Sequence, residues 1–98
     1  MTEQNLVVEL LKIGKRWGFI DNLTVTLRIG GKIRKVSIFR DISAHETLAE
    51  KCKDEKWITV CARYAVMKLL TGEEWRSEPE NCFVTGKRFG IAELLEDC

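Results

Sequence analysis

The sequence predicts an α+β domain in which a small antiparallel sheet packs against two helices. Three observations lead to this fold class. Residues 23–40 alternate apolar and polar side chains about a Gly-Gly pair, residues 43–53 and 56–71 repeat apolar side chains at helical spacing, and the chain has 98 residues. That length is typical of one domain. We therefore expect residues 1–98 to form a single globular domain with a sheet of three or four strands.

The N-terminal segment, residues 3–13, is compatible with two elements. Its apolar side chains form one stripe of a helix at Leu6, Val7, Leu10 and Leu11. Val7, Val8 and Ile13 are β-branched, however, and β-branched residues also suit a strand. The segment is predicted as a helix, with a strand as the alternative that the pattern leaves open.

The strongest local signal is a hairpin centred on Gly30 and Gly31. A two-residue Gly-Gly loop suits a primed turn, because both central residues need a positive φ. The register that follows places six apolar side chains on one face of the sheet: Leu23, Val25, Leu27, Ile29, Val36 and Ile38. Residues 21–22 offer a second tight turn, so an earlier strand should complete a three-stranded meander over residues 16–40.

Two helices should follow the hairpin. Ser43, with Glu46 three residues later, forms a capping box and predicts that the first helix spans about 43–53. The second, over about 56–71, is apolar on nearly all sides, which is typical of a helix at the buried centre of a domain. Gly72 is suited to end it. Farther along, residues 83–85 fit a short strand and the last nine residues fit a short C-terminal helix.

Charge and composition restrict the class of protein. Hydrophobic residues make up 45% and charged residues 32%, and the net charge is +1, which are values of a globular chain. The first 45 residues carry +4 and the remainder −3, so the charge is polarised along the chain. The N-terminus lacks the features of a secretory signal, and no apolar run is long enough to span a membrane. We expect a cytoplasmic protein with no membrane association, whose four cysteines stay reduced thiols.

A short motif occurs twice: "IGKRWGF" at residues 13–19 and "TGKRFGI" at residues 85–91. Glycines with adjacent Lys and Arg can bring backbone N–H groups and positive charge to a phosphate, and an aromatic side chain can stack on a base. The flanking residues share no similarity, which argues against a duplicated ligand loop. The motif is therefore interpreted as two hairpin corners, with Trp17 or Phe89 entering the core.

Basic residues concentrate around the predicted hairpin and suggest a nucleic-acid-binding surface. The register points Arg28 and Lys35 outward together with Phe39, while Lys32 and Arg34 fall at the end of the inner face. The candidate residues for this function are Lys15, Arg16, Arg28 and Lys35. Arg outside the sheet beside an exposed aromatic side chain would favour nucleic-acid binding.

The sequence offers no clear catalytic or metal-binding set. His45 is the only histidine, and seven residues separate it from Cys52, which is about 10 Å along a helix. No Cys-x-x-Cys pair occurs, and Cys52 and Cys61 lie in apolar stripes where the pKa of a thiol rises. We expect no metal, no cofactor and no enzymatic activity.

An acidic segment after the second helix is the candidate protein-binding site. It contains Glu73, Glu74, Trp75 and Glu78, and Trp is enriched at the centres of protein interfaces. The expected function is therefore non-catalytic binding of a larger protein, as an accessory, adaptor or inhibitor. Small inhibitors encoded by phages or mobile elements are one class of this size. The basic sheet and the acidic segment could also pair two copies as a homodimer.

Overall fold

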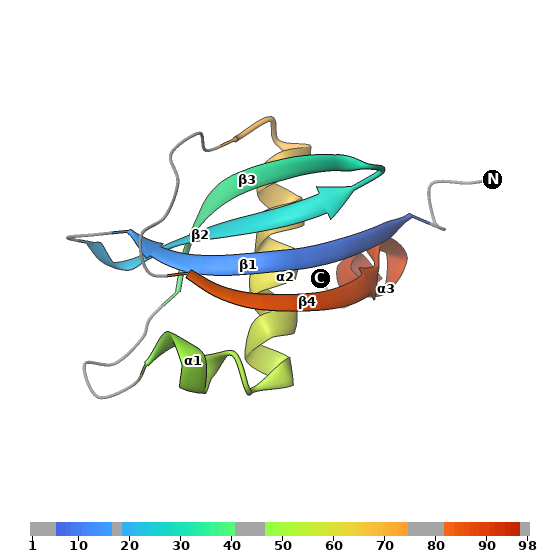
Figure 1. Ribbon diagram of the computed structural model, residues 1–98. Coiled ribbons are helices and arrows are strands. Elements are labelled where there is room, and N and C mark those ends of the chain that lie inside the picture. The colour runs from blue at the N-terminus through green and yellow to red at the C-terminus, as the bar shows by residue number, and fades with distance from the viewer. Residues whose placement is uncertain (1–5, 17–18, 41–46, 75–81, 97–98) are drawn as a thin grey trace.

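The structure is a computed structural model that describes residues 6–16, 19–40, 47–74 and 82–96, with the backbone alone described at 15, 16 and 19–22. Four strands form one antiparallel sheet in the order β3-β2-β1-β4 (Figure 1). Two of the helices are short. The elements are β1 Val7–Arg16, β2 Phe19–Ile29, β3 Lys32–Phe39, α1 Leu48–Lys51, α2 Glu55–Leu70, β4 Cys82–Gly90 and α3 Ile91–Glu96.

The predicted fold class is confirmed as an α+β arrangement. The long helix α2 runs behind the sheet in Figure 1 and packs against β2 and β3, while α3 packs against β4 and α2. One side of the sheet and one side of α2 therefore enclose the core. Among the described helices, none is long and apolar enough to cross a membrane.

The hairpin between β2 and β3 has the predicted register. Ile29 pairs with Lys32, and the pairing continues through Val25 with Val36. Gly30 and Gly31 have φ values of +57° and +79°, as a primed two-residue turn requires. Five of the six apolar side chains assigned to the inner face are fully buried, and Ile29 is half-buried.

The predicted N-terminal helix is wrong, because residues 7–16 form the strand β1. This strand lies inside the sheet and pairs with β2 on one side and β4 on the other. Val8, Leu10 and Ile13 are completely buried on the helix side of the sheet. The register shifts at Leu11, where a bulge adds one residue to β1. This extra residue breaks the period of two, and so the strand resembled a helical stripe in the sequence.

The predicted turn at residues 21–22 is also wrong. Both residues lie within β2, and Asn22 pairs with Phe39. The chain reverses earlier, between Arg16 and Phe19, which pair with each other. The meander therefore consists of β1, β2 and β3, and β4 joins it from the C-terminal part of the chain.

The helix predicted over residues 43–53 is shorter in the structure. Thr47 has extended backbone angles, φ −99° and ψ 158°, and its side chain accepts a hydrogen bond from the backbone N–H of Glu50. Thr47 is therefore the N-cap, and α1 begins at Leu48. Ser43 and Glu46, the predicted capping box, lie outside the described residues.

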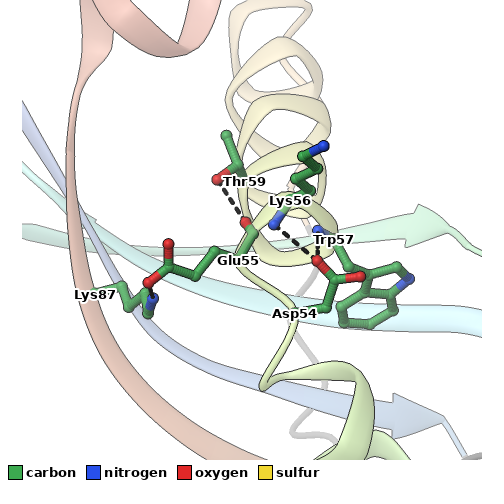
Figure 2. A network of polar contacts seen from close by, with 6 residues as sticks. All are labelled: Asp54, Glu55, Lys56, Trp57, Thr59 and Lys87. Carbon is green, nitrogen blue, oxygen red and sulfur yellow. Dashed lines mark hydrogen bonds and ion pairs between the residues drawn. The ribbon is translucent and has the colours of Figure 1, made fainter.

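The second helix matches its predicted bounds to within one residue at each end. Asp54 caps it by accepting hydrogen bonds from the backbone N–H groups of Lys56 and Trp57, at 3.0 and 3.3 Å (Figure 2). The helix lies at the core as predicted, although its apolar residues are not all buried. Six of its side chains are buried, but Tyr64, Met67 and Leu70 are exposed on its outer side. The helix covers one face of the sheet, so only one of its faces can be buried.

Two polar contacts join the C-terminal part of the chain to α2. Lys87 of β4 forms an ion pair with Glu55 at the start of α2, with an N–O distance of 2.9 Å (Figure 2). The Nε–H of Arg63 on α2 donates a hydrogen bond to the carbonyl oxygen of Leu94, at 2.7 Å. The short strand and the C-terminal helix predicted after residue 82 are confirmed as β4 and α3, although β4 is longer than predicted.

Candidate functional site

The side of the sheet opposite α2 gathers charged and exposed apolar side chains from all four strands. No described helix packs on this side, which faces the viewer in Figure 1. We call it the open face, and its described members are Val7, Glu9, Lys12, Gly14, Thr24, Thr26, Arg28, Ile33, Lys35, Ser37, Phe39, Cys82, Val84 and Arg88. The backbone pairing arranges most of these residues in rows that cross all four strands.

The first row is rich in charge. From β3 to β4 it reads Ile33, Arg28, Glu9 and Arg88. Arg28 Nη1 donates a hydrogen bond to Glu9 Oε1 at 3.1 Å. Arg88 is the backbone partner of Glu9 on β4, so the row contains two arginines and one glutamate. The row therefore keeps an excess of positive charge.

The second and third rows place small side chains at the centre. From β3 to β4 they read Lys35, Thr26, Lys12 and Val84, then Ser37, Thr24, Gly14 and Cys82. Thr24 and Thr26 are buried although they lie on the open face, with exposed fractions of 1% and 2%. The buried hydroxyl of Thr26 has no hydrogen-bond partner, and its neighbours in the row are Lys12 and Lys35.

Large apolar side chains are exposed along the border of this face. Ile33 and Phe39 on β3 are 57% and 70% exposed, and Val84 on β4 is 75% exposed. Val7 at the start of β1 is also exposed. The open face thus combines four basic side chains, one acidic side chain and four exposed apolar side chains among its described residues.

The structure brings together two of the four residues predicted to bind nucleic acid. Arg28 and Lys35 both lie on the open face and occupy adjacent rows, as the hairpin register predicted. Lys15 and Arg16 belong to the end of β1, and their side chains lie outside the described part of the chain. Arg28 and Phe39 occupy opposite ends of the face, so the expected pairing of an arginine beside an aromatic ring does not occur among these residues.

Val84 and Arg88 belong to this surface although the sequence did not predict them as members of it. Their position depends on the pairing of β1 with β4, which joins residues 68 to 83 positions apart in the chain. Exposed and half-buried side chains alternate along Cys82–Gly90 in the structure. The sequence of this strand does not alternate apolar with polar residues, so no local signal marked it as part of the face.

One of the two copies of the Gly-Lys-Arg motif lies at a hairpin corner. The chain reverses from β1 into β2 between Arg16 and Phe19, within the first copy, as that interpretation predicted. Residues 85–90 of the second copy lie in β4, so the interpretation is wrong there. Trp17 and Gly18 lie outside the described residues. Phe89 packs against the core as predicted, and Lys87 points to the helix side.

The acidic segment is engaged with its own chain where the structure describes it. Glu73 forms an ion pair with Lys68 at 3.5 Å and accepts a hydrogen bond from the hydroxyl of Thr71. Glu74 forms an ion pair with Arg34, which lies near the start of β3 on the side of the sheet that faces α2. Trp75 and Glu78 lie outside the described residues. The two described carboxylates are thus partly neutralised within the chain, which weakens the acidic segment as a charged binding site.

The described cysteines are free thiols. Burial raises the pKa of Cys52 to about 11 and that of Cys61 to about 12. Both thiols therefore stay protonated near neutral pH and are poor nucleophiles. Among the described residues, no group of three or more His, Cys, Asp or Glu side chains is arranged to hold a metal ion. His45 lies outside them.

Comparisons with known proteins do not extend this description. No protein-family model, no curated protein and no solved structure matched the chain. The assignment of a function therefore depends on the geometry of the open face.

Proposed function

We propose that the protein is a non-catalytic binding module whose open face binds an acidic surface of a larger protein. The module would act as an accessory, adaptor or inhibitor of that partner. The observation that carries this proposal is the composition of the open face, where basic side chains stand beside exposed aliphatic ones.

The charge of the face favours an acidic partner. The described residues of the face include four basic side chains, Lys12, Arg28, Lys35 and Arg88, and one acidic side chain, Glu9. Complementary charge speeds association and disfavours partners of the wrong sign. Arginine is also among the residues enriched in protein interfaces.

The apolar side chains favour a protein over a nucleic acid. Sheets that bind single-stranded nucleic acid stack bases on aromatic rings, and the protein described here has small side chains at the centre of its face. Phe39 is the one ring among the described members of the face, and it lies at the end of an edge strand. Ile33 and Val84 are aliphatic, and aliphatic side chains gain free energy by burial against a protein surface.

Affinity capture from the lysate of the native host tests this proposal. The bait is this protein, either as the wild type or with substitutions on the open face. The wild-type protein is compared with an Ile33→Thr/Phe39→Thr variant, in which both new residues are β-branched and suit a strand. Leu70→Ser is the matched control, because Leu70 is exposed on α2, away from the open face. We expect specific protein partners to be lost from the sheet variant and retained by the control, with and without nuclease.

Two outcomes would contradict the proposal. Partners retained equally by the sheet variant would place the binding surface elsewhere. Capture that disappears on nuclease treatment would instead support nucleic-acid binding through Arg28 and Lys35. In that case, Lys35→Gln and Arg28→Gln should each reduce the dependence of log K on log salt by about 0.7–0.9.

A further inference from the structure

A second surface feature lies on the helix side of the sheet, away from the open face. A pocket of about 490 Å³ opens between the C-terminal half of α2, the helix α3 and the end of the sheet near the β2–β3 turn. Val66, Leu69 and Leu70 line it from α2, and Ile91, Ala92 and Leu95 line it from α3. We call it the α2–α3 pocket. Its volume falls in the range of about 300–1,000 Å³ that is usual for small-molecule sites.

The walls of the α2–α3 pocket are tied to the core. The hydrogen bond from Arg63 to the carbonyl oxygen of Leu94 joins α3 to α2. The backbone N–H of Ile91 donates a hydrogen bond to the carbonyl oxygen of Leu6, at 3.0 Å, which joins the start of α3 to the start of β1. Leu94 itself is 1% exposed. These contacts hold the pocket in shape before any ligand enters.

One charged residue stands among the lining side chains. Arg34 contributes to the pocket, and the eight other lining residues are apolar. Its guanidinium forms an ion pair with the carboxylate of Glu74. The side chains of Arg34 and Glu74 are 41% and 43% exposed, and ion pairs at such exposure contribute little to stability because water screens them. Another carboxylate can therefore replace Glu74 on Arg34 at little cost.

We propose that the α2–α3 pocket binds a small amphipathic carboxylate, with its alkyl chain among the leucines and its carboxylate on Arg34. Arginine suits this role because its guanidinium can make two parallel hydrogen bonds to one carboxylate. In the protein without ligand, the Glu74 carboxylate occupies the place on Arg34 that the carboxylate of the ligand would take. Each buried methylene of the ligand adds to affinity by removal of apolar surface from water.

Titration with decanoate and with decan-1-ol tests this proposal, because the two probes share an alkyl chain and differ in charge. Binding is measured by calorimetry and located by NMR shifts of backbone amides in residues 66–70 and 91–95. We expect saturable decanoate binding with shifts at those amides. Arg34→Gln should weaken decanoate binding about two- to fivefold, since the half-exposed guanidinium no longer pairs with the ligand carboxylate. Glu74→Gln should strengthen it about two- to fivefold by removing the competitor.

The controls separate charge recognition from simple apolar binding. Arg28→Gln, on the open face, should leave decanoate affinity unchanged. Decan-1-ol should bind the wild type more weakly than decanoate does. It should bind the wild type and Arg34→Gln with equal affinity, and this equality also shows that the variant keeps its pocket. Equal binding of both probes to the wild type, or shifts confined to other residues, would overturn the proposal. Absence of saturable binding would overturn it as well.

Discussion

The hydroxyl of Thr85 donates a hydrogen bond to the backbone carbonyl oxygen of Leu10, and the two oxygens are 2.7 Å apart. This contact joins β4 to β1 where the register between the strands shifts, so that three steps along β4 match two along β1. Gly86 follows Thr85 with a φ of +65°. The irregular step in β4 therefore depends on a glycine conformation and on a side chain that bonds the neighbouring strand.

Gly86→Ala should destabilise the protein by about 1–2 kcal/mol, because a Cβ at positive φ strains the backbone. No neighbouring atom lies within 4 Å of a Cβ placed there, so the cost would come from the backbone alone. Urea unfolding measures the change. Gly90→Ala in the same strand is the control, since Gly90 lacks a positive φ, and it should be neutral or slightly stabilising. Equal losses in both variants would contradict the assignment.

Ala65→Asp should prevent folding. Ala65 is completely buried on α2, and an unpaired buried charge costs several kcal/mol, against a total stability of about 5–15 kcal/mol. Met67→Asp, two residues on and 43% exposed, should leave a cooperative thermal transition. Circular dichroism melts distinguish the two. A cooperative melt near that of the wild type for Ala65→Asp would show that the buried side of α2 is assigned incorrectly.

Asp54 and Glu55 are adjacent acidic residues, and we expect them to contribute different amounts to the free energy of unfolding. Asp54→Ala should cost about 1 kcal/mol, because the carboxylate caps two backbone N–H groups at the start of α2. Glu55→Gln should cost less, since Glu55 is 82% exposed in its ion pair with Lys87. Chemical denaturation at low and high salt gives both values. The effect of Glu55→Gln should shrink at high salt, whereas most of the Asp54→Ala effect should remain.

Thiol labelling should separate the cysteines by burial. In a Cys98→Ser background, Cys82 is exposed and should react with a disulfide reagent in the native state at neutral pH. Cys52 and Cys61 should react only after unfolding, because they are buried and protonated. Mass spectrometry of the labelled peptides identifies the sites. Rapid native labelling of Cys61 would contradict its position in the core.

The same thiols should make stability depend on alkaline pH. The ordinary thiol pKa is 9.0, and burial raises that of Cys52 to about 11 and that of Cys61 to about 12. Above pH 9 the unfolded chain therefore releases protons that the folded chain keeps. The free energy of unfolding should fall as the pH rises from 9 toward 11 and stay unaffected by these groups below pH 9. A Cys52→Ala/Cys61→Ala variant should show a smaller fall over that range.

The sequence alone determined the elements that local signals specify. The Gly30-Gly31 turn established the β2–β3 register, because a two-residue loop leaves one pairing and alternation assigns each side chain to a face. The bounds of α2 followed from a long apolar segment between Asp54 and Gly72. The outward positions of Arg28 and Lys35 followed from the same hairpin register.

The tertiary structure decided everything that depends on pairing between distant segments. Residues 7–16 became a strand because β2 and β4 satisfy their backbone groups on both sides, which outweighs a weak helical pattern interrupted by the bulge at Leu11. Only this pairing brings Lys12, Val84 and Arg88 onto the open face. Glu74 and Arg34 are 40 positions apart in the sequence, and only the folded chain brings them together beside the α2–α3 pocket. Such contacts depend on how the whole core packs, and no local pattern encodes them.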